Sequence, residues 1–287
     1  MSTKFLTDKL TLEQNALKIR KGILRAMFSN KGGHIGGSLD LAEMLAVVYT
    51  DFMEIDPKNP RYENRDFMIF SKGHAGPALY STLALKGVIS YDQLDNLNNV
   101  NSKLPGHCDR NKVMGVDAST GSLGQGLSIA AGVALGAKIK KTNQKVFCVT
   151  GDGESGEGQI WEAAQFAAHH KLDNLIAFLD WNKMQIDGTV DEVLTLGDPV
   201  EKYTAFGWNT VCVKGTDVLS IQEAVKRAID NKNGKPTMIV LDTVKGQGLN
   251  CIMEMKNNHC IGISDELKSK IIDEINAQAK KLGIEEI

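Results

Sequence analysis

The sequence of 287 residues carries a formal net charge of −2 and contains 28 glycines and 6 prolines. This charge balance excludes the broad basic face that binding to nucleic acid requires. No apolar run approaches the length that spans a membrane, and the charged N-terminal segment lacks the apolar stretch of a secretory signal. The cysteines form no C-x-x-C pair, so we expect a reduced, cytoplasmic protein.

Helical patterns and glycine-rich turns alternate in the first half of the chain. Apolar residues recur at helical spacing over 9–30, and the glycine-rich segment 32–37 breaks that helix. A second helix is expected to open at Ser38 or Asp40 and to run through Val48. The next segments are expected as a strand at 66–70, a helix with Pro77 in its first turn, a polar excursion at 92–118 and a small-residue helix at 122–140.

Apolar runs separated by helical patterns characterise the second half. Such alternation favours a parallel sheet with helices on both faces. We find no repeat and no break in composition, and therefore expect one doubly wound, mostly parallel α/β domain over residues 1–287. The expected strands are 146–149, 175–179, 209–213 and 237–241, and the expected helices include 219–231 and 264–282.

The segment 145–187 carries the strongest chemical signal. An apolar strand stops at a Gly-Asp-Gly turn centred on Asp152, and a second apolar strand ends just before Asn182. A right-handed crossover between the two strands would bring these side chains to one edge of the sheet. Their oxygen atoms suit a divalent ion, Mg²⁺ or else Ca²⁺ or Mn²⁺, and the flanking glycines let a phosphate approach. The alternative is an ordinary turn in which Asp152 caps the following helix.

Three histidines lie in glycine-bearing turns, namely His34, His74 and His107. A histidine can donate to phosphate or hydroxyl oxygens or move a proton near neutral pH. Each of them alone could be a hydrogen-bonded surface residue, but their recurrence at expected strand ends favours one shared pocket. His169 and His170 lie within a helical pattern and are expected to be structural or solvated.

Five motifs, in order, resemble the N-terminal part of transketolases. They are GGHIGGSLDLAEML, SKGHAGPALY, LPGHCDRNKVMGVDASTGSLGQGLSIAAGVAL, the GDG–Asn unit and DTVKGQG. The GDG–Asn unit looks like the signature of thiamin-diphosphate enzymes, in which Asp, Asn and a nearby backbone carbonyl bind the metal that bridges the diphosphate. The resemblance covers nearly the whole chain and implies thiamin diphosphate and Mg²⁺ as cofactors.

The resemblance also implies roles for individual residues. It assigns the metal to Asp152, Asn182 and the carbonyl of Met184, and it assigns sugar contacts to His34 and His107. His259 is grouped with these catalytic histidines and is also expected to touch the diphosphate. Further cofactor contacts are implied for Lys72, His74, Gly121, Ser122, Leu123, Gly153, Glu154, Asn182, Ile186 and Lys245.

Glu157 and Glu162 match family carboxylates at the subunit contact, near the acid that activates the cofactor. Glutamates near the start of a helix also interact favourably with the helix dipole, whatever the function of the protein. Other simple alternatives are surface charges for Lys72 and Lys245 and plain core packing for Leu123 and Ile186.

The sequence departs from the family pattern at three places. Ile35 and Cys108 stand where a proline commonly follows the active-site histidine. NNHCIG stands where the family usually has Trp-His-Gly, so His259 could instead be a solvated loop residue.

Full-length transketolases continue, after the matched region, with a pyrimidine-binding domain that carries an activating glutamate and with a further C-terminal domain. This sequence has no segment that matches them, so we expect a split transketolase whose partner is a C-terminal subunit, in a two-by-two heterotetramer. The expected reaction moves a two-carbon ketol unit from a ketose phosphate to an aldose. The alternatives are a subunit of a 1-deoxyxylulose-phosphate synthase-like or 2-oxoacid dehydrogenase-like enzyme, or a non-catalytic cofactor-binding subunit.

Overall fold

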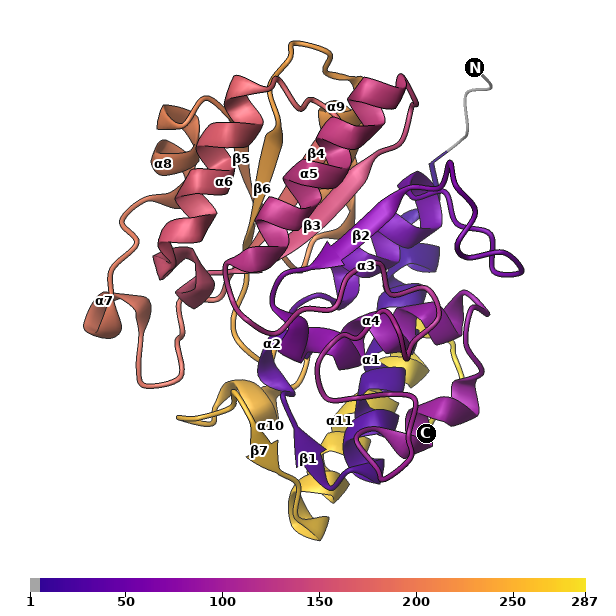
Figure 1. The fold of residues 1–287 in the computed structure, drawn as a ribbon. Coiled ribbons are helices and arrows are strands. Elements are labelled where there is room, and N and C mark those ends of the chain that lie inside the picture. The colour runs from indigo at the N-terminus through magenta and orange to yellow at the C-terminus, as the bar shows by residue number, and fades with distance from the viewer. Residues whose placement is uncertain (1–5) are drawn as a thin grey trace.

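The computed structural model describes residues 6–287, and a five-stranded parallel sheet forms its centre (Figure 1). The strands follow the order β2-β3-β4-β6-β5, and every neighbouring pair is parallel. Their bounds are β2 Phe67–Phe70, β3 Val146–Gly151, β4 Leu175–Trp181, β5 Asn209–Lys214 and β6 Thr237–Asp242. The expected parallel sheet is therefore confirmed.

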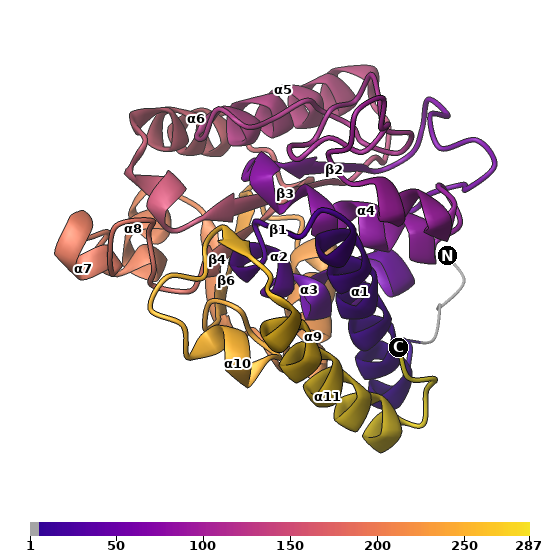
Figure 2. The same ribbon diagram turned by 90° about the horizontal axis from the view of Figure 1, so that it is seen from below.

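Helices cover both faces of this sheet, as Figure 2 shows. One face packs against α5 Gln125–Lys140, α6 Gly158–His169 and α8 Pro199–Ala205. The opposite face packs against the layer made by α1 Lys9–Ser29, α3 Ala42–Val47, α4 Gly76–Leu85, α9 Val218–Asp230 and α11 Asp265–Leu282.

The alternation of side chains along a strand explains this double burial. In β3, Phe147 and Val149 join the core on the α1 side, whereas Val146 and Cys148 join the core on the α5 side. All four side chains are fully buried. A strand buried on both faces must be apolar throughout, which is why these strands appear in the sequence as unbroken apolar runs.

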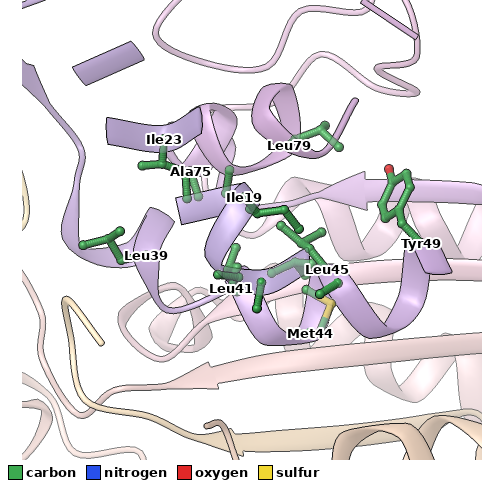
Figure 3. Close-up of a cluster of buried hydrophobic side chains, with 14 of the residues drawn as sticks. Ile19, Ile23, Leu39, Leu41, Met44, Leu45, Tyr49, Ala75 and Leu79 are labelled. Atoms are coloured by element: carbon green, nitrogen blue, oxygen red, sulfur yellow. The ribbon is translucent and has the colours of Figure 1, made fainter. Parts of the chain in front are cut away.

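The largest hydrophobic cluster joins α1, α3 and α4 (Figure 3). It includes Ile19 and Ile23 of α1, Leu45 of α3 and Leu79 of α4, each at most 1% exposed. Full burial of one such side chain stabilises the fold by about 1.5–3 kcal/mol. This cluster holds the N-terminal helices against the sheet and so fixes the turn between α1 and α3.

The helix expected from Ser38 or Asp40 to Val48 is interrupted. The chain forms α2 Gly36–Leu39, breaks, and then forms α3, which passes into a π-helical turn at Val48–Phe52. The break falls at Asp40, whose carboxylate accepts hydrogen bonds from the backbone N–H groups of a distant loop. The periodicity of apolar residues gives no information about such a tertiary contact, so the break could not be predicted from it.

A two-stranded antiparallel sheet lies beneath the main sheet in Figure 1. It pairs β1 Gly32–Gly33 with β7 Ile261–Gly262. The remaining short elements are α7 Val190–Val193, α10 Asn250–Met253 and the 3₁₀ turns Gly73–Ala75, Tyr91–Asn96 and Gly153–Gly156.

The cysteines at 108, 148, 212, 251 and 260 are all free. Within the described range 6–287, no helix is both long and apolar enough to cross a membrane.

Candidate active site

A cavity of about 390 Å³ opens at the carboxyl edge of the main sheet. Residues that follow four of the strands line it, among them Lys72 after β2, Asp152 after β3, Asn182 after β4 and Lys245 after β6. Open parallel sheets bind ligands at this edge because the loops there converge. The crossover predicted from the sequence therefore brings Asp152 and Asn182 into one pocket.

Asp152 presents an unsatisfied oxygen to this pocket. The residue is 5% exposed, and its Oδ1 accepts a hydrogen bond from the Gly153 N–H at 2.8 Å. Its Oδ2 is buried and has no hydrogen-bond partner among the described residues. Burial and the nearby Asp180 carboxylate raise the pKa of Asp152 to about 6. A buried carboxylate oxygen without a partner is costly, and a bound cation would satisfy it.

Asn182 and Met184 supply two further oxygens beside the sheet edge. Asn182 Oδ1 accepts a hydrogen bond from the Met184 N–H at 3.0 Å, and the Met184 carbonyl accepts one from Lys245 Nζ at 3.1 Å. Among residues 6–287 no group of three or more His, Cys, Asp or Glu side chains is arranged to hold a metal. The available donors are instead one carboxylate, one amide and one carbonyl, which are hard oxygens that fit Mg²⁺ better than a softer ion.

A buried ion pair lies directly behind these oxygens. Lys72 Nζ contacts Asp180 Oδ2, and the two side chains are 3% and 0% exposed. Burial alone would lower the pKa of Lys72, but the Asp180 and Asp40 carboxylates outweigh it and the pKa is raised. Lys72 is therefore not the surface charge that the sequence left open, and it adds positive charge to the floor of the pocket.

Four histidine rings form the other wall of the cavity. The ring centroid of His34 lies 5.2 Å from that of His74, 5.5 Å from that of His107 and 5.3 Å from that of His259. The centroids of His74 and His259 are 4.9 Å apart. The shared pocket expected for the first three histidines is confirmed, and His259 joins it. His169 and His170 lie exposed at the end of α6, as expected.

Three long-range contacts bring these histidines together. The pairing of Gly33 with Ile261 in the small sheet sets the His34 turn beside the His259 loop. Hydrogen bonds from the Cys108 N–H to the Gly73 carbonyl and from Tyr80 Oη to the His107 carbonyl, both 3.1 Å long, fix the His107 turn beside His74.

Three of the four rings, those of His34, His74 and His259, have a lowered pKa and so favour the neutral form. Burial and the Lys72 ammonium lower the pKa of His74 to about 2. Burial and Lys245 lower the pKa of His259 to about 4, and burial and His107 lower the pKa of His34. A neutral ring offers one N–H donor and one acceptor, which suits hydroxyl and carbonyl oxygens of a sugar.

Most of the other residues that the resemblance implied also line the cavity. Gly121, Leu123, Gly153, Glu154, Ile186 and Lys245 all do so.

Glu154 lines the cavity, yet its carboxylate is already used within the protein. The carboxylate accepts hydrogen bonds from Ser71 Oγ and from the N–H groups of Gly124 and Gly151 at 2.8 and 2.9 Å. These bonds tie the ends of β2 and β3 to the start of α5. A direct contact between Glu154 and a cofactor stays a prediction.

Three predicted residues lie outside the cavity lining. Ser122 is exposed, and Glu157 and Glu162 are exposed at the start of α6. The exposure of Glu157 and Glu162 is compatible with a position at a subunit contact. This role stays a prediction.

Two buried carboxylates in this region were missed from the sequence. Asp180 lies in β4 and Asn182 follows the strand's last residue, Trp181; Asn182 Nδ2 donates a hydrogen bond to Asp180 Oδ2. A spacing of two is typical of one strand face, so this spacing was a usable signal. Asp40 reaches the site from the α2–α3 junction, and no local pattern marks it.

The fold and the site together define a doubly wound α/β domain with a polar cavity at the carboxyl edge of its parallel sheet, and comparisons with known proteins identify its family. Residues 13–286 match the family described as "Transketolase, thiamine diphosphate binding domain". The chain therefore belongs to the transketolase family and carries its thiamin-diphosphate-binding domain.

Two relatives match the chain over nearly their whole length. The chain is 43% identical to the 6-deoxy-6-sulfo-D-fructose transketolase subunit SqwG of Clostridium sp. (strain MSTE9), over 94% of this chain and 98% of the relative. It is 38% identical to an apulose-4-phosphate transketolase subunit of Phocaeicola vulgatus, over 95% and 96% respectively.

The fold also matches solved transketolases. The transketolase of Campylobacter jejuni superposes with a TM-score of 0.87 at 31% identity, over 97% of this chain and 44% of that one. The chain thus spans less than half the length of that solved enzyme.

Proposed function

We propose that this chain is the diphosphate-binding subunit of a split transketolase, which transfers a two-carbon ketol unit from a ketose to an aldose. A partner subunit would supply the pyrimidine-binding domain and the activating glutamate. The relatives named as transketolase subunits, which match this chain almost end to end, support this division. We further propose a two-by-two heterotetramer in the cytoplasm, with Glu157 and Glu162 at the subunit contact.

One observation carries the proposal. The buried, unpartnered Oδ2 of Asp152 shares a cavity with the Asn182 amide, the Met184 residue and a wall of four histidines. Oxygen atoms suited to a metal and a polar wall suited to a sugar thus lie in one pocket, and ketol transfer on thiamin diphosphate would require this combination. When bound, the cofactor would supply the electron sink for cleavage of a carbon–carbon bond next to a carbonyl.

The residues of this chain would hold and orient the reacting groups. Asp152, Asn182 and the Met184 carbonyl would bind Mg²⁺. Lys245 and His74 would face the diphosphate, and the exposed Ile186 would pack against the cofactor ring.

The histidine wall would act on the sugar. His34 and His107 would donate hydrogen bonds to the carbonyl oxygen and hydroxyls of the sugar and would move protons there. His259, which lies next to His34 and Lys245, would contact both the sugar and the diphosphate.

We propose a ketose with an anionic terminal group as the donor. The two relatives are named for a sulfonated hexose and for a phosphorylated sugar, apulose 4-phosphate. The only ammonium groups that line the described cavity, Lys72 and Lys245, lie on its metal side, which leaves the far end of the sugar to the partner subunit.

Co-purification with the subunit encoded beside it tests the proposal. The pair should transfer ketol units from 6-deoxy-6-sulfofructose, apulose 4-phosphate, fructose 6-phosphate or xylulose 5-phosphate, and neither subunit should be active by itself. Full activity from this chain alone would refute the split enzyme. Activity restricted to decarboxylation of 2-oxoacids would place the chain with another class of thiamin enzyme.

A further inference from the structure

The carboxylate of Asp40 joins three separate parts of the pocket. Asp40 lies at the break between α2 and α3, six positions after His34, and is 1% exposed. Its Oδ1 accepts hydrogen bonds from the N–H groups of Gly246 and Gln247 at 2.7 and 3.1 Å. Its Oδ2 accepts one from Asn182 Nδ2 at 3.1 Å. One side chain therefore links the His34 turn, the Asn182 side chain and the loop that begins at Lys245.

The contact with Asn182 determines which way its amide faces. Asn182 Nδ2 has two hydrogens, and it donates to Asp40 Oδ2 and to Asp180 Oδ2, the latter at 2.9 Å. A carboxylate can only accept hydrogen bonds, so a flipped amide would set its oxygen against two acceptors. The amide oxygen is thereby kept on the side of Met184, where it is available to a cation.

The contact with Gly246 and Gln247 holds the lysine loop. Gly246 has φ +85°, and a Cβ added there would lie 2.6 Å from the Ile252 side chain, so this turn is tightly enclosed. Lys245 Nζ, directly before the turn, contacts the Met184 carbonyl. Asp40 thus anchors the loop that carries the cation facing the diphosphate.

Other buried charged side chains surround Asp40. The charged groups that face Asp40 are Asp180, Lys72 and Lys245. The Lys72 ammonium interacts electrostatically with both the Asp40 and the Asp180 carboxyl groups.

We propose that Asp40 is a positioning residue that couples the affinity for the metal to the affinity for the diphosphate. It does so by fixing the Asn182 amide on one side and the Lys245 loop on the other. This inference rests on the proposed cofactor and goes beyond it, because it assigns a joint effect on two ligands to a residue that touches neither.

A second buried acid provides a matched control. Glu43 in α3 is 8% exposed and pairs with Arg20 at 2.6 Å. Arg20 Nε donates to the Gln247 carbonyl, so this pair supports the same loop. The Glu43 carboxylate accepts hydrogen bonds from the side chains of Arg20 and Gln247 rather than from Asn182. Glu43→Gln replaces one buried carboxyl group by an amide, as Asp40→Asn does.

The test measures binding of Mn²⁺ and of thiamin diphosphate to the full chain, together with its partner, by titration, alongside thermal unfolding. Asp40→Asn should weaken both affinities by about tenfold or more, since altering a residue that orients a metal ligand typically costs about 10–100-fold. Glu43→Gln should lower the Tm and leave the Mn²⁺ affinity within about twofold of wild type. Equal affinities in wild type and Asp40→Asn, or equal losses in both variants, would overturn the inference and leave the proposed function intact. A wild-type chain that binds neither ligand would refute both.

A second measurement requires no variant. Saturating Mg²⁺ without thiamin diphosphate should slow hydrogen exchange at the Gly246 and Gln247 amides, because the metal stabilises the Asn182 orientation to which Asp40 is bonded. Unchanged exchange at these amides, with metal binding confirmed by titration, would overturn the coupling.

Discussion

The two walls of the pocket are built in different ways. The metal wall, which is proposed to bind the metal, is made of Asp152, Asn182 and Lys72. These buried residues follow the ends of adjacent parallel strands. The histidine wall, made of His34, His74, His107 and His259, depends on loops and on two residue pairs in a small sheet. A local crossover suffices to bring Asp152 and Asn182 together, whereas the histidine wall needs segments from both ends of the chain. We expect the metal wall to set cofactor binding and the histidine wall to set the reaction with the sugar.

The largest effect is expected at Asp152. Asp152→Asn should abolish Mg²⁺-dependent binding of thiamin diphosphate and lower ketol transfer by about a thousandfold, because the one carboxylate in the donor set is lost. The variant should fold with an unchanged or higher Tm, since it removes a buried negative charge near Asp180. Calorimetry and thermal unfolding check both parts. Retained Mg²⁺-dependent binding would contradict the role of the metal wall.

A smaller effect on the reaction should come from the histidine wall. His34→Ala and His107→Ala should each lower kcat for ketol transfer by about 100-fold or more, through loss of a proton donor at the sugar. Binding of thiamin diphosphate should stay within a few-fold of wild type in both variants. Steady-state kinetics together with calorimetry distinguish an effect on the reaction from an effect on cofactor binding. Loss of cofactor binding in these variants would contradict separate roles for the two walls.

The small sheet offers a direct way to disturb the histidine wall. Gly32 has φ +137°, and a Cβ there would lie 2.1 Å from the Ile261 carbonyl oxygen. Gly32→Ala should therefore destabilise the fold by about 1–3 kcal/mol and displace His259, as chemical denaturation and the His259 NMR signals would report.

Gly262 is the matched control, because a Cβ there meets nothing within 4 Å. Gly262→Ala should leave stability and the His259 signals almost unchanged. Equal effects of the two substitutions would mean that β1–β7 pairing does not position His259.

The smallest expected effect concerns pH. The folded-state pKa of His74 is lowered to about 2, chiefly by burial, so below its ordinary pKa of 6.5 the unfolded chain binds a proton that the folded chain does not. His74 therefore contributes a loss of stability as pH falls below 6.5. His74→Gln should reduce the stability lost between pH 7 and pH 5 by about 2 kcal/mol. Denaturation at the two pH values measures this, and identical losses in wild type and variant would contradict it.

The contrast between the walls also explains what the sequence could predict. The β3–α6–β4 crossover and its two oxygen-bearing residues followed from local patterns, because strand, turn and helix signals lie within one continuous segment. Asp180, inside β4, was not predicted as a site residue, although it lies only two positions before Asn182, which follows the strand directly.

Other parts of the site could not be predicted from local patterns. His259 reaches the cavity through the pairing of Gly33 with Ile261, and only a family resemblance pointed to it. Asp40 interrupts an otherwise helical pattern because its carboxylate bonds to Gly246 and Gln247, far along the chain. Contacts of this kind depend on tertiary packing and leave no periodic trace in the sequence.

One titration tests the central claim most directly. Thiamin diphosphate is added to the chain mixed with its partner subunit, once with Mg²⁺ and once with a chelator. We predict saturable binding of one cofactor per copy of this chain with Mg²⁺ and its loss with the chelator. Equal binding in both conditions, or none in either, would contradict a metal–diphosphate site at Asp152 and Asn182.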